Sequence, residues 1–338
     1  MLKHELQLEL VSVQKVRWLL LIGLLVSLRG LGEFTFVYDG SPFHKYITSK
    51  DSVERVHDQE IGELSADYLF GDKEVDLNRV DELGQETGKG IEESYAWLEF
   101  VLAIENLFII ILLLSLMSVV LLCYVKIQLH PSVVLIYLIA GVYIFLQAFA
   151  IVQNGGKGFS DLAIGAHATR YTLALLLVGY TFLHRVKEDH KITYQKGLFL
   201  LGAIACSATF AVHGWEAYNL HAGFIDLIIG SAHLLNLHPS QTSVTKLLIL
   251  IGIMDMVLAA LVLLYPSRKL LYWMAFWGLV TALSRPLSMG ISSWHETAIR
   301  AGNFVLPFCL AMLVSAGLYW KPLQVCGSGK IGQVAEAN

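Results

Sequence analysis

The sequence predicts an all-α, polytopic membrane helix bundle with about eight transmembrane helices. Apolar residues make up 55% of the 338 residues and charged residues only 15%, whereas soluble globular proteins carry about 25% charged residues. The apolar residues gather in runs long enough to cross a bilayer. The lysines and arginines between these runs fall in alternate loops, which is typical of a multi-pass protein.

Each predicted span follows from the roughly 20 apolar residues that a helix needs to cross the hydrocarbon core. Lipid offers no hydrogen-bond partner to backbone N–H and C=O groups. These segments must therefore be helices, in which the backbone groups bond to one another. We expect none of them to be broken in its middle. The eight segments are residues 17–37, 97–125, 132–152, 163–184, 195–215, 244–265, 269–290 and 298–320.

The distribution of positive charge predicts that both chain termini lie in the cytoplasm. Positively charged residues favour the cytoplasmic side in short loops. Among the expected outer loops that are short, Lys157 is the clear exception. The first 18 residues lack the form of a cleaved secretory signal, so the first span is expected to be retained. The expected cytoplasmic positive charges are Lys3, Lys15, Arg17, Lys126, Arg185, Lys187, Lys191, Lys196, Arg268, Lys269, Lys321 and Lys330.

One outer loop, residues 38–95, is long enough to form a small acidic domain. It holds fifteen acidic residues and six lysines or arginines. Parts of it could form amphipathic helices over the outer face, and the loop is a candidate docking surface for a membrane or extracytoplasmic protein partner. The alternating oxygen ligands of residues 72–78 resemble a calcium loop, but the glycine expected at its sixth position is missing. A solvated acidic face is therefore the favoured interpretation.

The chain also contains an apparent internal duplication. A Pro-Ser pair opens both 131-PSVVLIYLIAG and 266-PSRKLLYWMAF, and the matches Tyr137 with Tyr272 and Gly155 with Gly290 share one offset. The simplest interpretation is two four-helix units that run parallel about an axis along the membrane normal. The alternative is chance similarity between apolar helices. The predicted divisions are residues 1–184 with the acidic loop inserted, residues 185–322, and a cytoplasmic tail, residues 323–338.

Polar residues near the membrane collect on one side of the predicted topology, the outer face. Charged groups inside a bilayer are costly, so their placement points to a role. They either form structural ion pairs and extend to the headgroups, or converge on outward-facing cavities. The candidate ligand-binding residues are Arg29, Glu33, His167, Arg170, His213, Glu216, Asp255, Arg285, Arg300 and Asn303. Glu105 is expected to lie deeper in the membrane and to correspond to Asp255 in the other unit.

Several chemistries are not predicted. The four cysteines form no CxxC pair, so neither a disulfide framework nor a zinc site is expected. No basic stripe suits a nucleic acid, and no nucleotide-binding or catalytic motif is visible. Haem remains a candidate cofactor, because His167 and His213 are expected at one depth on neighbouring spans. A hydrogen-bonded structural role is the commoner one for such histidines.

Three segments carry a resemblance to a known family, and one of them, 209-TFAVHGWEAY-218, is the partner of the first in the second half. The first span and the turn after it, 17-RWLLLIGLLVSLRGLGEF-34, together with 300-RAGNFVLPFCLAML-313, resemble the four-helix unit of the DoxX-like membrane families. Applied twice, the resemblance covers most of the chain outside the acidic loop. It implies a bacterial inner-membrane protein related to a small subunit of a thiosulfate:quinone oxidoreductase, or to proteins of redox maturation or cargo handling. The absence of paired cysteines argues against a disulfide-related role.

The sequence therefore leaves three hypotheses open for the function. The first is a binding or redox-partner subunit that holds a small amphipathic molecule, such as a quinone or lipid, in an outward-facing pocket. The second is a proton-coupled secondary transporter that uses Glu105 and Asp255. The third is a scaffold or assembly factor that docks through residues 38–95. A stand-alone enzyme is the least supported class.

Overall fold

The computed structural model describes residues 2–38, 40–49, 77–124, 132–154 and 160–319, and every regular element within these ranges is a helix. The long helices are α1 (Leu2–Val37), α4 (Leu77–Tyr124), α5 (Ser132–Asn154), α7 (Ala168–Phe182), α8 (Glu188–Tyr218), α10 (Gln241–Leu264), α11 (Arg268–Met289) and α13 (Gly302–Ser315). The short helices are α2 (Pro42–Ser49), η1 (Ser160–Leu162), α6 (Ala163–Ala166), η2 (Leu183–Arg185), α9 (Ala222–Leu234), η3 (Ile291–Ser293) and α12 (Trp294–Ile299).

Within the described residues, six segments are long and apolar enough to cross a membrane, and a seventh is reached if one bent pair counts as a single span. The six lie in α1, α4, α5, the stretch from η1 to η2, α8 and α10. The multi-pass helical class is therefore confirmed. The expected count of eight is not, because α11 is absent from this set. Aromatic and polar positions in α11, Arg285 among them, lower its mean hydropathy.

The last span differs from the sequence prediction. We expected an unbroken helix over residues 298–320, but α12 and α13 meet at an angle of 48°. The break falls at Arg300 and Ala301, where backbone N–H groups bond to carbonyls three residues earlier. The predicted fourth span has a milder interruption at His167, between α6 and α7, which does not bend it by more than 40°.

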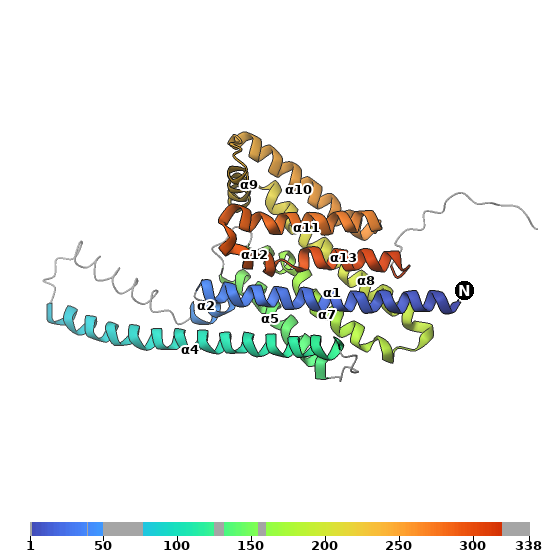
Figure 1. Ribbon diagram of the computed structural model, residues 1–338. Helices are drawn as coiled ribbons and strands as arrows, with labels where there is room; N and C mark the ends of the chain where they lie inside the picture. Colours follow the sequence, from blue (N-terminus) through green and yellow to red (C-terminus); the bar gives the residue numbers. More distant parts are fainter. Residues whose placement is uncertain (1, 39, 50–76, 125–131, 155–159, 320–338) are drawn as a thin grey trace, which may run out of the picture.

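The acidic loop is only partly described. Residues 50–76, with most of the suggested calcium loop, lie outside the described residues. At the two sides of that gap, α2 follows the first span, and α4 begins at Leu77, 20 residues before the predicted start of the second span. Figure 1 shows that the N-terminal part of α4 extends beyond the end of the bundle that carries α2, α9 and α12.

The two halves of the chain pack against each other through their first helices. Among the described residues of each half, a long helix is followed by a short one, two long helices, a 3₁₀ turn and a broken helix. The first helix of one half packs on the broken helix of the other: α1 contacts α12 and α13, and α8 contacts α6 and α7. The short helices α2, α9 and α12 lie at one end of the bundle, and the N-terminus lies at the other (Figure 1).

Two glycines allow α8 and α10 to pack closely. A Cβ atom at Gly252 would lie 2.6 Å from the backbone nitrogen of Tyr218, and one at Gly214 would lie 2.8 Å from the carbonyl oxygen of Gly252. Helices in a membrane associate by close packing rather than by the hydrophobic effect, and small residues permit that approach. These two glycines therefore set the spacing of the helices that form one wall of the site described below.

A buried carboxylate fixes α2 to the bundle. Oε1 of Glu105 in α4 accepts hydrogen bonds from Ser41 Oγ, from the Tyr143 hydroxyl at 2.7 Å and from Gln147 Nε2 at 3.4 Å. Ser41 Oγ also accepts from the backbone nitrogen of His44, in the manner of an N-cap. Glu105 is therefore a structural anchor here, with three donors around one oxygen.

A pair of glycine substitutions tests the packing of α8 on α10. In Gly252→Ala, the added methyl group meets the α8 backbone, and we expect a lower midpoint of thermal unfolding in detergent micelles. Gly197→Ala is the matched control in α8, because a Cβ atom there meets nothing within 4 Å. That control should gain up to about 1 kcal/mol from helix propensity. Equal midpoints for the two variants would contradict the close approach.

Candidate functional site

Two adjoining cavities lie among the helices, with volumes of about 280 Å³ and 390 Å³. The smaller, which we call the α9 cavity, is formed by α8, α9, α10, α11 and α13. The larger, the central cavity, lies between the two halves and receives residues from α1, α2, α5, η1, α6, α7, α8, α9, α11 and α12, and from His167, His221 and Arg300 next to helix ends. The residues that line both cavities are His213, Phe224, Arg285 and Arg300.

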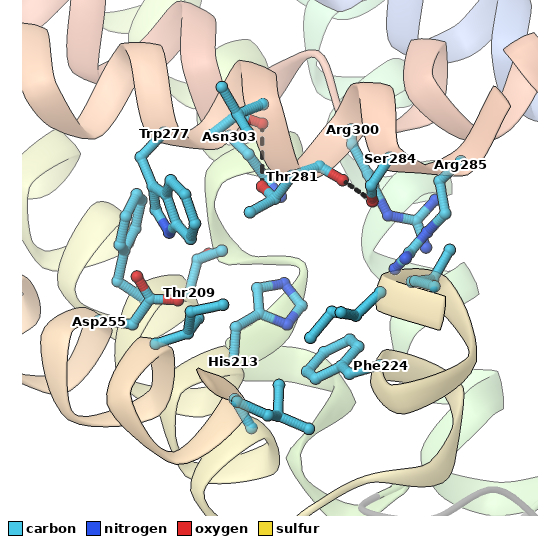
Figure 2. Close-up of a pocket in the computed structure, with 18 of the residues that line it drawn as sticks. Thr209, His213, Phe224, Asp255, Trp277, Thr281, Ser284, Arg285, Arg300 and Asn303 are labelled. Atoms are coloured by element: carbon cyan, nitrogen blue, oxygen red, sulfur yellow. Dashed lines mark hydrogen bonds between the residues drawn. The ribbon is translucent and has the colours of Figure 1, made fainter. Parts of the chain in front are cut away.

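The α9 cavity has an apolar wall and two polar ends. Figure 2 shows Asp255 and Trp277 at one side, Arg285 and Arg300 at the other, and His213 between them. The apolar wall comes from Phe210, Phe224, Leu227, Ile228, Leu248, Ile251 and Val280. Such a mixture of apolar surface and a few convergent polar groups is typical of sites that bind small molecules.

Asp255 is the deeply buried acid of the α9 cavity. The residue is 5% exposed, and its Oδ1 has no hydrogen-bond partner among the described residues. The indole nitrogen of Trp277 lies on the same side of the cavity (Figure 2) and also lacks a partner there. The carboxylate of Asp255 and the indole N–H of Trp277 interact with each other at this side of the cavity, but without full hydrogen-bond geometry, so both groups are incompletely satisfied, which costs free energy.

The central cavity holds three arginines but only two glutamates. Arg300 is paired with Glu296, and it also donates to the Glu296 backbone carbonyl at 2.7 Å. The Glu216 carboxylate lies 3.2 Å from Nδ1 of His213. The side chains of Arg170 and Arg285 make neither a hydrogen bond nor an ion pair with any described residue.

Arg170 and Arg285 differ in their surroundings. Arg170 is only 6% exposed, and its Nε is buried without a partner. Arg285 is half-buried, with its guanidinium carbon 6.0 Å from the centre of the Phe224 ring. That geometry permits a weak cation–π contact. It does not replace the five hydrogen bonds that a guanidinium can donate.

A proline explains how α12 is held against Arg285. Pro286 has no N–H, so the carbonyl of Ala282 one turn earlier in α11 loses its helical partner. The hydroxyl of Thr297 in α12 donates to that carbonyl at 2.8 Å instead. This bond ties α12 to α11, and it brings Glu296 and Arg300 to the side of the cavity where Arg285 lies.

The two helix breaks place polar residues from both halves in contact. Thr169, two residues after the break at His167, donates its hydroxyl proton to Oδ1 of Asn303 at 2.7 Å. Gly302 allows the approach, because a Cβ atom there would lie 3.0 Å from the backbone of Arg170. The Thr209 hydroxyl of α8 accepts from the Thr169 backbone at 3.2 Å. Asn303 is thereby fixed where it lines the α9 cavity.

Eight of the ten candidate residues from the sequence line these cavities. His167, Arg170 and Glu216 line the central cavity, Asp255 and Asn303 line the α9 cavity, and His213, Arg285 and Arg300 line both. Arg29 and Glu33 line neither. They pair with each other at 3.2 Å, and Arg29 lies over the ring of Trp294 at 5.7 Å with a side chain that is 55% exposed.

Glu296, Thr297 and Thr169 are not among the candidate residues that the sequence predicts. Glu296 could have been predicted from the sequence, because Glu296 and Arg300 are four residues apart and so share one helix face. The roles of Thr297 and Thr169 depend on contacts between helices. The cluster around Glu105 was also not anticipated, since the expected equivalence with Asp255 did not include the donors that surround Glu105.

Neither cavity presents an evident metal site. No group of three or more His, Cys, Asp or Glu side chains in the described part of the chain is arranged to hold a metal ion. His167 and His213, the pair considered for haem, do line the central cavity together. Each uses Nδ1 elsewhere: in His167 it lies 2.7 Å from the Ala163 carbonyl, and in His213 it faces Glu216.

Comparisons with protein-family models, with curated proteins and with solved structures gave no match for this chain. The resemblance to the DoxX-like families therefore stays a prediction from sequence, and the site has to be interpreted from its own chemistry.

The bond between Thr297 and the Ala282 carbonyl gives a direct test of this geometry. Thr297→Val keeps the side-chain shape but leaves a buried carbonyl without a donor, and should lower the free energy of unfolding by about 1–3 kcal/mol. The matched control is Thr181→Val in α7, whose hydroxyl bonds within its own helix to the Leu177 carbonyl. That carbonyl keeps its helical partner, so the control should lose less. The free energy of unfolding is measured by reversible unfolding in mixed micelles. An equal decrease for the two variants would contradict the hydrogen bond between Thr297 and the Ala282 carbonyl.

Proposed function

We propose that this chain is a multi-pass membrane protein that binds a small amphipathic molecule in the α9 and central cavities, as a binding or redox-partner subunit. A single observation carries the proposal: two adjoining cavities combine an apolar wall with unpaired polar groups at one end of the bundle. The α9 cavity, at about 280 Å³, is just below the range for small-molecule pockets, about 300–1,000 Å³, and the central cavity, at about 390 Å³, is within it. A quinone or a lipid is a suitable class of ligand.

The positive charges support an orientation for this site. Lysines and arginines cluster in the loops assigned to the cytoplasm, which favours cytoplasmic termini in a bacterial inner membrane. The cavity-lining helices α9 and α12 lie at the end of the bundle opposite the N-terminus (Figure 1). Under this orientation the cavities open toward the outer face.

We also infer that the two halves arose by duplication. The repeated order of helices and the equivalent breaks at His167 and Arg300 support this, at the offset that aligns Ala168 with Ala301. Local hydrogen bonds repeat as well: the N–H of Arg170 bonds to the His167 carbonyl at 3.0 Å, and that of Asn303 to the Arg300 carbonyl at 2.9 Å. Duplicated parallel units are also known from transporters.

A transporter is the second candidate function, and the structure supplies two observations in its favour. The helix interruption at Arg300, absent from our sequence prediction, resembles the broken helices that form transport sites. Asp255 lines a cavity, so it is the better placed acid for proton coupling, whereas Glu105 is held by three donors. Proton-driven uptake into vesicles that is lost in Asp255→Asn would favour this function over passive binding.

The scaffold hypothesis rests on the acidic loop, residues 38–95, much of which lies outside the described residues. It predicts that removing residues 45–90 abolishes co-purification of a membrane or extracytoplasmic partner while the spans still insert. Retained co-purification would contradict docking through this loop.

The proposed pocket can be tested by filling it. Ile228→Trp should place a large ring in the α9 cavity and reduce the amount of amphipathic molecule that co-purifies, measured by mass spectrometry of lipid extracts. The matched control is Leu234→Trp, on the same helix but 59% exposed and outside both cavities. Equal amounts of the amphipathic molecule in extracts of the two variants and the wild type would contradict the pocket. A visible absorption spectrum of the same samples tests haem, because a Soret band would identify a different occupant.

A further inference from the structure

The unmatched positive charge of the central cavity indicates which class of amphipathic molecule it takes. Arg170, Arg285 and Arg300 contribute three positive charges, and Glu216 and Glu296 contribute two negative charges. Both glutamates already have partners, in His213 and Arg300. With a neutral His213, this cluster is one negative charge short of balance.

Burial makes that imbalance expensive. Arg170 is 94% buried, since its exposed fraction is 6%, and its Nε has no partner. Removing a charge from water costs several kcal/mol unless a counter-charge and hydrogen bonds compensate for it. Arg170 and Arg285 line the same cavity and repel each other electrostatically, so an anion placed between them is attracted by two positive charges. Arginine suits carboxylate and phosphate oxygens because its fork of donors matches their geometry.

The apolar part of such a ligand has a place next to the arginines. Arg285 and Arg300 line both cavities, so these positive charges lie at the boundary between the central cavity and the α9 cavity. Beyond it, Phe224, Leu227 and Ile228 offer apolar surface. Asp255, at the far side in Figure 2, can accept a hydrogen bond from a hydroxyl or amine on the ligand but repels a second anionic group.

Building on the proposed function, we propose that the ligand is an anionic amphiphile. Its carboxylate or phosphate group lies between Arg170 and Arg285, and its apolar body extends into the α9 cavity. The acidic group supplies the charge that the cluster lacks. A neutral or cationic amphiphile of equal length leaves both arginines unpaired and is bound more weakly.

Direct binding of defined probes to the full-length chain in phosphatidylcholine nanodiscs tests this inference. We expect radiolabelled decyl phosphate to bind above empty nanodiscs, and to be displaced poorly by decanol and by inorganic phosphate. Arg170→Gln and Arg285→Gln should each weaken decyl phosphate binding about tenfold or more, the effect of losing a charge-assisted hydrogen bond. Arg29→Gln is the matched control, because Arg29 lines neither cavity. The affinity of this variant for decyl phosphate should stay within about twofold of the wild-type affinity.

Stability without ligand separates a binding role from a structural one. Because Arg170 is buried and unpaired, Arg170→Gln should unfold at the wild-type temperature or above it when no ligand is present. A lower unfolding temperature for this variant, with decyl phosphate affinity unchanged in Arg285→Gln, would overturn the proposal and make these arginines structural.

The probes also distinguish failure of this inference from failure of the pocket. If decanol binds as tightly as decyl phosphate, the anionic class is wrong but the amphiphile pocket stands. If inorganic phosphate binds as tightly as decyl phosphate, the site takes a free anion and the apolar body has no role. If none of the three probes binds, the inference and the proposed function fail together.

Discussion

The structure depends on the cost of keeping charged side chains inside an apolar helix bundle. Some charged groups meet that constraint in part within the protein: three donors surround Oε1 of Glu105, although its Oε2 lacks a partner, and Arg300 pairs with Glu296. Arg170 and Arg285 do not. An unpaired buried charge destabilises a fold unless a ligand uses it. These two arginines therefore connect the architecture of the bundle to the proposed function.

Local departures from regular helix create the space and the contacts around these arginines. The interruptions at His167 and Arg300 bring the two broken helices together, through Thr169 and Asn303. The missing N–H of Pro286 allows α12 to dock on α11. Regular helices would satisfy their own backbone groups and would offer fewer polar contacts to their neighbours. The irregular end of the bundle is thus the part suited to binding.

Much of this organisation could be predicted from sequence, because the relevant signals are local. Apolar runs predicted the helices, and costly charges in those runs predicted eight residues that line cavities. Arg29 and Glu33 line neither cavity, and their four-residue spacing indicates a pair but not the direction in which it faces. The break at Arg300 and the role of Thr297 were missed because they arise from contacts between helices that no single segment encodes.

The central claim is that a polar cavity, open to water on the side opposite the N-terminus, lies among the helices. Cysteine labelling tests it most directly, with a membrane-impermeant maleimide and a background in which the native cysteines are replaced. Ser284→Cys lies in the α9 cavity, and Ser115→Cys lies on α4 outside both cavities. The account predicts that only the first is labelled, that it is labelled from the outer side, and that decyl phosphate protects it. Labelling from the cytoplasmic side alone, or equal labelling at the two positions, would contradict the account.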